Sequence, residues 1–183
     1  MPTVVTITGS PSHPSRSAAL AQHVGHQLVA RGFEHASINV RDLPATALLA
    51  GRADDEAIAA AIRQVERAEA IVVVTPIYKA AYSGVLKTFL DVLPQLALAG
   101  KVVLPLVTGG THAHVLALDY ALRPVLVALG AQHIVNGLFV LDKTLVMSER
   151  GLAIDSEVEQ RLAVIIEDFA TSVVRRASAP RAD

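Results

Sequence analysis

The chain has 183 residues, of which 52% are hydrophobic and 18% are charged, and its formal net charge is -1. A nearly neutral chain without a basic run does not suit a protein that binds nucleic acid by neutralising phosphates. Because the chain has no cysteine, disulfides, thiolate catalysis and cysteine-ligated metals are excluded. The high apolar content predicts that part of the surface is buried between subunits.

Strand and helix patterns alternate along the chain. In order, we expect a strand at 3–8, a helix at 17–31, a strand at 35–40, a helix at 54–68, a strand at 70–75, a helix at 83–93, a strand at 101–108, a helix at 113–129, a strand at 132–141 and a helix at 156–176. The strands are mostly apolar, which is typical of parallel strands covered on both faces. The pattern predicts an α/β fold with one five-stranded parallel sheet, in the flavodoxin-like order 2-1-3-4-5, and helices on both faces.

The alternation continues without a linker, so we expect a single domain over residues 1–176 and a disordered tail at 177–183. No secretory signal precedes the first predicted strand, and no apolar run reaches the roughly 18 residues of a membrane span. We therefore expect a cytoplasmic protein without a membrane partner.

The turn after the first strand is rich in hydroxyl groups. Ser10, Ser15 and Ser17 surround Arg16 just before the first predicted helix. Hydroxyls, free N–H groups at a helix start and one guanidinium are the donors that a dianionic monophosphate needs. An ordinary helix cap, with Ser15 or Ser17 as the N-cap residue, explains the same residues.

The turn after the third strand combines a proline with aromatic residues. Pro76 and Ile77 end the apolar run, and Tyr78, Lys79 and Tyr82 follow. Backbone N–H groups and a flat aromatic wall at this point would suit a flavin ring. Alternatively, Tyr78 and Tyr82 are aromatic residues of a subunit interface, where such residues are enriched, and both roles are compatible.

The turn after the fourth strand contains Gly109, Gly110 and Thr111. The two glycines would let the backbone approach a ligand closely, although a plain turn needs them equally. His112 and His114 follow at a spacing that does not place them on one helix face, so we expect no metal site. By topology, all three turns meet at the carboxyl edge of the sheet.

The predicted helix at 113–129 holds a conflict, because Pro124 in its interior removes a hydrogen bond and crowds the carbonyl of Tyr120. A π-bulge at Tyr120 would relieve the strain, and such bulges often mark functional sites. The alternative is a simple proline kink with Tyr120 in the core.

Three blocks of the sequence resemble the NAD(P)H-dependent FMN reductases of two-component alkanesulfonate monooxygenase systems, in the flavodoxin-like superfamily. The blocks are Gly9-Ser10-Pro11 with Ser15-Arg16-Ser17, the stretch from Pro76 to Thr88, and the stretch from Gly100 to Leu126. The match covers nearly all of residues 3–141, and the second and third blocks are more specific to the sulfonate-linked branch.

The resemblance implies a reaction and a set of site residues. NADPH or NADH would transfer a hydride to FMN by direct stacking, with no catalytic side chain, and the reduced FMN would leave for an FMNH2-dependent alkanesulfonate monooxygenase. The phosphate would be held by Ser10, Ser15, Arg16 and Ser17. The isoalloxazine would be lined by Pro76, Ile77, Tyr78 and Lys79 and flanked by Gly109, Gly110 and Thr111. Tyr120 would be the tyrosine of a π-helix at the interface of a homotetramer, with Tyr82 also at the oligomer interface, although the sequence leaves dimer and tetramer open.

Three other functions are compatible with parts of the sequence. An enzyme that retains FMN and reduces quinones, azo dyes or metal oxyanions would share the fold and the cofactor. An electron-transfer flavodoxin is disfavoured by the net charge of -1, because such proteins are usually strongly acidic. A flavodoxin-like interaction or sensor module would not oxidise NADPH with any acceptor.

Overall fold

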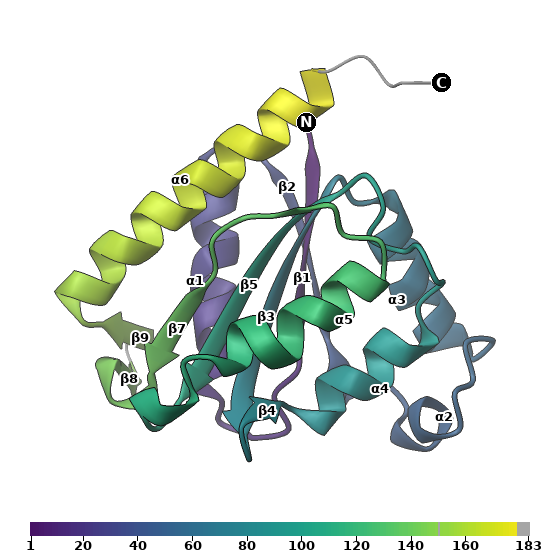
Figure 1. Cartoon of the computed structure of the whole chain (residues 1–183), viewed down its shortest axis with the longest axis horizontal. Helices are drawn as coiled ribbons and strands as arrows, with labels where there is room; N and C mark the ends of the chain where they lie inside the picture. The colour runs from purple at the N-terminus through teal and green to yellow at the C-terminus, as the bar shows by residue number, and fades with distance from the viewer. Residues whose placement is uncertain (150, 179–183) are drawn as a thin grey trace.

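The computed structural model describes residues 1–149 and 151–178. The parallel strands of its central sheet are β1 (Thr3–Thr8), β2 (Glu34–Asn39), β3 (Ala70–Tyr78), β5 (Val102–Gly109), β6 (His133–Ile134) and β7 (Leu138–Leu141). They are arranged in the order β2-β1-β3-β5, with β6 and β7 following one another along the free edge of β5 (Figure 1). Because β6 and β7 together occupy the place of the fifth strand, the predicted flavodoxin-like sheet is confirmed.

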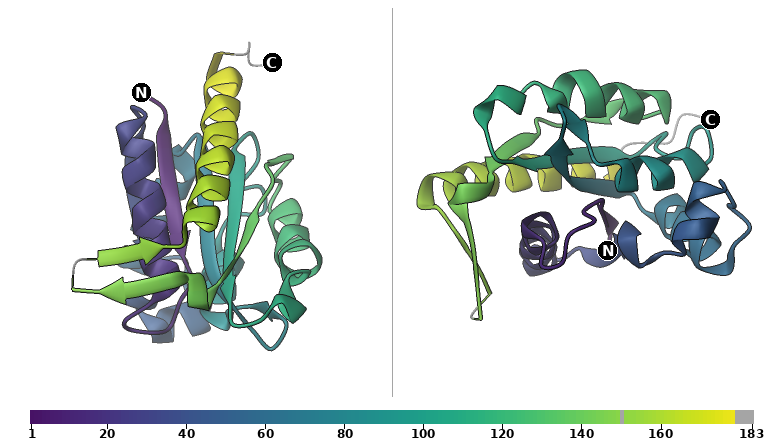
Figure 2. Two further views of the ribbon diagram at one scale, coloured as in Figure 1. Left: turned by 90° about the vertical axis from the view of Figure 1, so that its left-hand side faces the viewer. Right: turned by 90° about the horizontal axis from the view of Figure 1, so that it is seen from below.

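Helices cover both faces of the sheet (Figures 1 and 2). One face packs against α1 (Arg16–Ala30) and α6 (Ser156–Ser178), and the other against α3 (Glu56–Arg67), α4 (Gly84–Val92) and α5 (Arg123–Ala128). Successive residues of a strand point alternately into the hydrophobic cores on the two faces. Val72 packs in the core under α1 and α6, whereas Ile71 and Val73 pack in the core under the other helices. This double burial explains the uniformly apolar strands.

The helix predicted at 113–129 is wrong. This segment contains a 3₁₀ turn, η2 (His112–His114), then a π-helix, η3 (Leu118–Leu122), and only then α5. The N–H of Arg123 donates to Leu118 O, the five-residue spacing of a π-helix. Pro124 therefore falls in the first turn of α5, where its missing N–H costs nothing. The π-helix lies where Pro124 predicts a bulge, and Tyr120 within it is 79% exposed rather than part of the core.

The continuous strand predicted at 132–141 is also wrong, because it is broken into β6 and β7. Val135 N–H donates to Val103 O at 3.0 Å, and the next donor on that side of β5 would belong to Pro105, which has none. Gly137 lies against Pro105, and a Cβ at Gly137 would approach the carbonyl oxygen of Pro105 to 2.4 Å. The proline and the close approach together explain the interruption.

Several short elements have no counterpart in the sequence prediction. They are η1 (Val40–Asp42), α2 (Ala45–Leu49), β4 (Ala81–Tyr82), η4 (Asp142–Thr144), and the antiparallel pair β8 (Leu145–Ser148) and β9 (Gly151–Ile154). The β8–β9 hairpin projects from the body beside α1 (Figure 2). α6 continues to Ser178, two residues into the segment predicted as a tail, and residues 179–183 lie outside the described residues.

Candidate functional site

The turns after β1, β3 and β5 meet at the carboxyl edge of the sheet, and side-chain hydrogen bonds join them. The buried Ser83 hydroxyl donates to Gly9 O, which joins the second turn to the first. The hydroxyls of Ser17 and Thr108 lie 2.7 Å apart and join the start of α1 to the end of β5. These bonds make the three turns one structural unit.

The first turn contains both donors for a phosphate and residues that serve the fold. Ser15 is the N-cap of α1 and accepts a hydrogen bond from Ala18 N at 3.1 Å, and the Ser17 hydroxyl is turned into the buried pair with Thr108. The capping interpretation is therefore correct for the Ser15 side chain. The Ser10 hydroxyl, the N–H groups of the first turn of α1 and the Arg16 guanidinium are the groups best suited to an anion.

Arg16 is exposed, and its Nε donates to Leu145 O at 3.1 Å, at the base of the β8–β9 hairpin. This bond uses only one edge of the guanidinium. Its two Nη groups are available for a phosphate, because a guanidinium presents donors in several directions. Arg16 thus links the turn after β1 to a hairpin almost 130 positions away in the sequence.

The second turn is a tight hairpin between β3 and β4. Tyr78 pairs with Ala81, so Lys79 and Ala80 form a two-residue loop, and both have positive φ, 50° and 65°. Such a loop usually contains glycine or asparagine, and other residues with positive φ carry a strain of about 1 kcal/mol or more each. Conformations of this kind cluster at ligand sites. Lys79 and Ala80 are exposed, whereas Pro76 and Ile77 are buried in the strand.

Two tyrosines flank this hairpin. Tyr78 is 45% exposed, and its Oη lies 3.4 Å from the Ser12 hydroxyl, so the aromatic ring lies next to the turn after β1. Tyr82 is half-buried opposite Ile77, and burial raises the pKa of its phenol.

The third turn contains one glycine that the packing requires and one with free space beside its Cα. A Cβ at Gly109 would meet the Phe139 ring at 2.8 Å, so this glycine is explained by packing within the protein. Gly110 and Thr111 are exposed, and a Cβ at Gly110 would come no nearer than 3.9 Å to the Asp142 carboxylate. Gly110 is therefore the position at which a ligand could approach the backbone.

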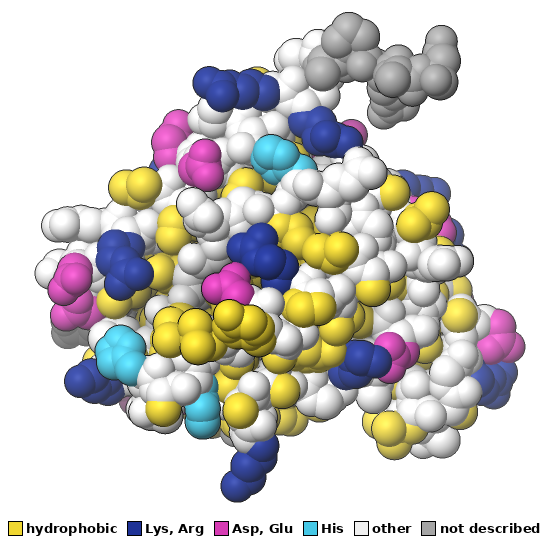
Figure 3. Space-filling view, in the orientation of Figure 1, with side chains coloured by type: hydrophobic (Ala, Val, Ile, Leu, Met, Phe, Trp, Pro, Cys, Tyr) yellow, Lys and Arg dark blue, Asp and Glu magenta, His cyan; other side chains and the backbone are white. Residues whose placement is uncertain are grey.

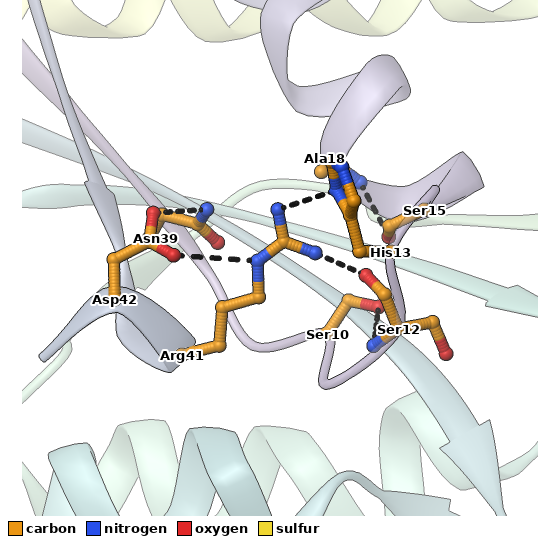
Figure 4. Close-up of polar contacts among 8 residues, drawn as sticks. All are labelled: Ser10, Ser12, His13, Ser15, Ala18, Asn39, Arg41 and Asp42. Carbon is orange, nitrogen blue, oxygen red and sulfur yellow. Dashed lines mark hydrogen bonds and ion pairs between the residues drawn. The ribbon is translucent and has the colours of Figure 1, made fainter.

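The sequence did not predict the hydrogen bonds by which Ser83 and Thr108, both within the predicted turns, hold the site together, nor the contribution of Arg41. Ser83 precedes a helix, which signals a cap, but its bond to Gly9 spans 74 positions and has no local signature. Arg41, on η1, reaches the first turn, where Nη1 donates to Ser12 O and Nη2 donates to His13 Nδ1 at 3.1 Å (Figure 4). No pattern in the sequence indicates this contact.

The residues present fit a flavin mononucleotide. Residues 9–17 supply hydroxyls, helix N–H groups and a guanidinium and contain no acidic side chain. Tyr78 supplies an aromatic surface beside them, and the exposed backbone of the second and third turns supplies polar contacts for a ring edge. Within residues 1–149 and 151–178, no group of three or more His, Asp or Glu side chains could hold a metal, and no helix is long and apolar enough to cross a membrane.

The fold is a flavodoxin-like sheet, with anion-binding groups in the turn after β1 and an aromatic side chain in the turn after β3. This combination is typical of an α/β flavoprotein. Residues 2–145 match the NADPH-dependent FMN reductase family, and the chain belongs to this family. It is an oxidoreductase whose cofactors are FMN and a reduced nicotinamide nucleotide.

Two relatives can be aligned with almost the whole chain, and a third with about three quarters of it. FMN reductase (NADPH) of Escherichia coli (strain K12) is 43% identical over 173 residues, which is 94% of this chain and 91% of that protein. FMN reductase (NADPH) of Pseudomonas putida (strain KT2440) is 44% identical over 175 residues, 94% of this chain and 89% of that protein. NADH-dependent FMN reductase SfnE of Pseudomonas putida is 35% identical over 74% of this chain and 75% of that protein.

A solved structure shows the same fold. The apo form of the NADH:FMN oxidoreductase EMOB superposes with a TM-score of 0.87 at 42% identity and covers 94% of this chain and 90% of that one. Of these four similar proteins, two are named for the use of NADPH and two for the use of NADH.

Proposed function

We propose that this FMN reductase releases its reduced flavin to an FMNH2-dependent alkanesulfonate monooxygenase in the cytoplasm. The observation that carries the proposal is the π-helix Leu118–Leu122 with the exposed Tyr120, the feature by which the chain resembles the reductases of sulfonate-linked systems. The second and third sequence blocks, from Pro76 to Thr88 and from Gly100 to Leu126, support the same branch.

The proposed flavin contacts follow the three turns. The residues that hold the phosphate are Ser10, Ser15, Arg16 and Ser17, with Ser15 and Ser17 contributing chiefly through the backbone and the helix start. The ring contacts are Pro76, Ile77, Tyr78 and Lys79 on one side and Gly109, Gly110 and Thr111 at the edge. FMN, when bound, accepts the hydride of the reduced nicotinamide, and the protein contributes mainly by stacking and orienting the two rings.

The exposure of the site favours release of the flavin. Tyr78, Lys79, Gly110 and Thr111 all lie at the surface of the single chain. A flavin held by backbone groups and one guanidinium at an open rim would exchange with solvent more readily than one enclosed by the fold. An FMN-retaining quinone, azo or metal-oxyanion reductase is the alternative that this property opposes.

We also propose that Tyr120 and Tyr82 lie at a subunit interface of a homo-oligomer, a tetramer by resemblance. Figure 3 shows hydrophobic side chains gathered over η3 and α5, where Tyr120 and Val127 are 79% and 56% exposed. Leu116, two residues before η3, is 60% exposed. Tyr120→Ala should shift the sedimentation coefficient toward a smaller species. Leu49→Ala, at an equally exposed site on α2, is the matched control and should not. An unchanged sedimentation profile for Tyr120→Ala would remove Tyr120 from the interface.

Coupled turnover tests the sulfonate assignment. The reductase, NADPH and FMN are mixed with a purified FMNH2-dependent alkanesulfonate monooxygenase and octanesulfonate in air, and sulfite is measured. We expect sulfite release that requires the reductase and FMN together. NADPH oxidation without sulfite, in a mixture where chemically reduced FMN does support sulfite release, would contradict the sulfonate partnership while leaving the FMN reductase activity intact.

A further inference from the structure

We propose that Arg41 is a positioning residue of the flavin phosphate site and that it makes the site selective for FMN over unphosphorylated riboflavin. The inference rests on the proposed placement of the phosphate at the turn after β1. It concerns a residue outside all three blocks of the flavin site.

The topology brings Arg41 to this turn. β1 and β2 pair in parallel with Thr8 opposite Asn39, so their carboxyl ends lie side by side. η1 begins directly after β2, and its Arg41 side chain, only 21% exposed, lies across the opening of the first turn (Figure 4). A second guanidinium thus stands at the turn, on the side of β2, while Arg16 approaches from α1.

The Asp42 carboxylate orients the guanidinium of Arg41 on one side, and hydrogen bonds to the first turn hold it on the other. Asn39 Nδ2 donates to one oxygen of Asp42 at 2.7 Å, and Arg41 Nε lies 3.4 Å from the other oxygen. Arg41 Nη1 then donates to Ser12 O and Nη2 to His13 Nδ1. Because arginine can only donate, His13 must present an unprotonated Nδ1 here. The Asp42 carboxylate is occupied by Arg41 and Asn39, which limits its repulsion of an anion.

The contact with Ser12 O controls the orientation of a peptide group in the turn. In a planar trans peptide the C=O and the following N–H point in opposite directions. By holding Ser12 O, Arg41 therefore fixes the His13 N–H away from itself. The other hydrogen bonds of residues 10–13 are long: Ser12 N donates to Ser10 Oγ at 3.4 Å, and the Ser12 hydroxyl lies 3.4 Å from Tyr78 Oη. The guanidinium of Arg41 thus supplies the strongest restraint on the conformation of residues 10–13.

This role predicts a selective loss of affinity. Without Arg41 the turn loses two charge-assisted hydrogen bonds and a nearby positive charge, so its donors are no longer held for a phosphate. The isoalloxazine contacts on the second and third turns are unaffected. Arg41→Gln should raise the Kd for FMN about tenfold, the scale of one charge-assisted hydrogen bond, and leave the Kd for riboflavin unchanged.

The test is quenching of flavin fluorescence by the intact flavin-free protein, titrated with FMN and with riboflavin. Variants are Arg41→Gln, Arg41→Lys, which keeps the charge without the planar fork, and Arg52→Gln as the control. Arg52 is an exposed arginine whose guanidinium pairs with Asp54. We expect wild type and Arg52→Gln to prefer FMN to the same degree, Arg41→Gln to lose most of the preference, and Arg41→Lys to fall between.

The role of Arg41 and the flavin-binding function are tested by different outcomes. Equal Kd values of Arg41→Gln and wild type for FMN, or equal losses for FMN and riboflavin, would overturn the role of Arg41 alone. If Arg41→Gln proves unfolded by circular dichroism, the comparison of Arg41→Lys with wild type decides in the same way. A wild-type protein that binds neither flavin would overturn the proposed function itself.

Discussion

Ser83 is the residue whose loss should do most damage to the site, because one hydroxyl joins two turns and caps a helix. It is 2% exposed, accepts a hydrogen bond from Leu86 N at 3.1 Å and donates one to Gly9 O. In Ser83→Ala the α4 cap is lost, which costs about 1 kcal/mol. The buried Gly9 carbonyl also loses this donor, which costs about 1–3 kcal/mol. We predict that the free energy of unfolding falls by about 2–4 kcal/mol.

Urea unfolding followed by circular dichroism measures this change. The control is Ser178→Ala, because the Ser178 hydroxyl also donates to a backbone carbonyl, Val174 O at 3.0 Å, but is exposed. That control should change the free energy of unfolding by less than about 0.5 kcal/mol. Ser83→Ala should also weaken FMN binding, because the first and second turns are no longer joined. A stability loss no larger than that of the control would refute the role assigned to this bridge.

Three further predictions concern separate parts of the molecule. Arg16→Ala should weaken FMN binding by about 1–3 kcal/mol, the scale of a charge-assisted hydrogen bond, and an unchanged Kd in a flavin titration would exclude the phosphate role. Lys101→Met should lower the free energy of unfolding by about 1–3 kcal/mol, measured in urea, because the buried Lys101 amine donates to two carbonyls at the end of α3, at 2.9 and 2.6 Å. Burial, and then the charge of a neighbouring histidine, lower the pKa of His35 below 6.5, so the unfolded chain takes up the proton more readily. Stability should therefore fall as the pH drops below about 6.5, and His35→Gln should flatten that dependence in thermal melts across this range.

The sheet could be predicted from the sequence because burial on both faces leaves a local signature. β3 and β5 are unbroken apolar runs, and the parallel order follows from the alternation with helices. The interruptions could not be predicted in the same way. The break between β6 and β7 depends on Pro105, a residue of the neighbouring strand against which Gly137 lies, so a window around residues 132–141 contains only part of its cause.

Pro124 was an informative local signal. A proline inside a helical pattern removes a hydrogen bond and crowds a carbonyl, so the helix must be irregular close to it. The sequence therefore indicated where the irregularity lies, and the structure supplies its form, a π-helix followed by a new α-helix. The β8–β9 hairpin gave no comparable signal. In β8 only Leu145 is buried, and Val146 and Met147 are exposed, so this strand shows no alternation. In β9 the half-buried Leu152 and Ile154 alternate with exposed residues, but over four residues only.

For the candidate site, the sequence indicated the turns and the structure shows how they are held. The hydroxyl groups and the arginine of the turn after β1 are close in the sequence, so a phosphate site there could be predicted from local residue types. The bonds that join the turns, from Ser83 to Gly9 and from Ser17 to Thr108, connect residues 74 and 91 positions apart. Arg41 reaches the turn only because β2 pairs with β1. Such contacts follow from the tertiary arrangement and have no spacing that a sequence pattern can detect.

We claim that FMN is a substrate that leaves the enzyme, and anaerobic reduction is the measurement that decides it. Flavin-free protein is mixed with excess NADPH and a large molar excess of FMN, with no other electron acceptor, and the bleaching of the flavin absorbance is followed. We predict that the FMN pool is reduced almost completely, many equivalents per subunit, at a rate that saturates with FMN. Reduction that stops near one FMN per subunit, and resumes only when a quinone is added, would show that FMN is retained and would contradict the claim.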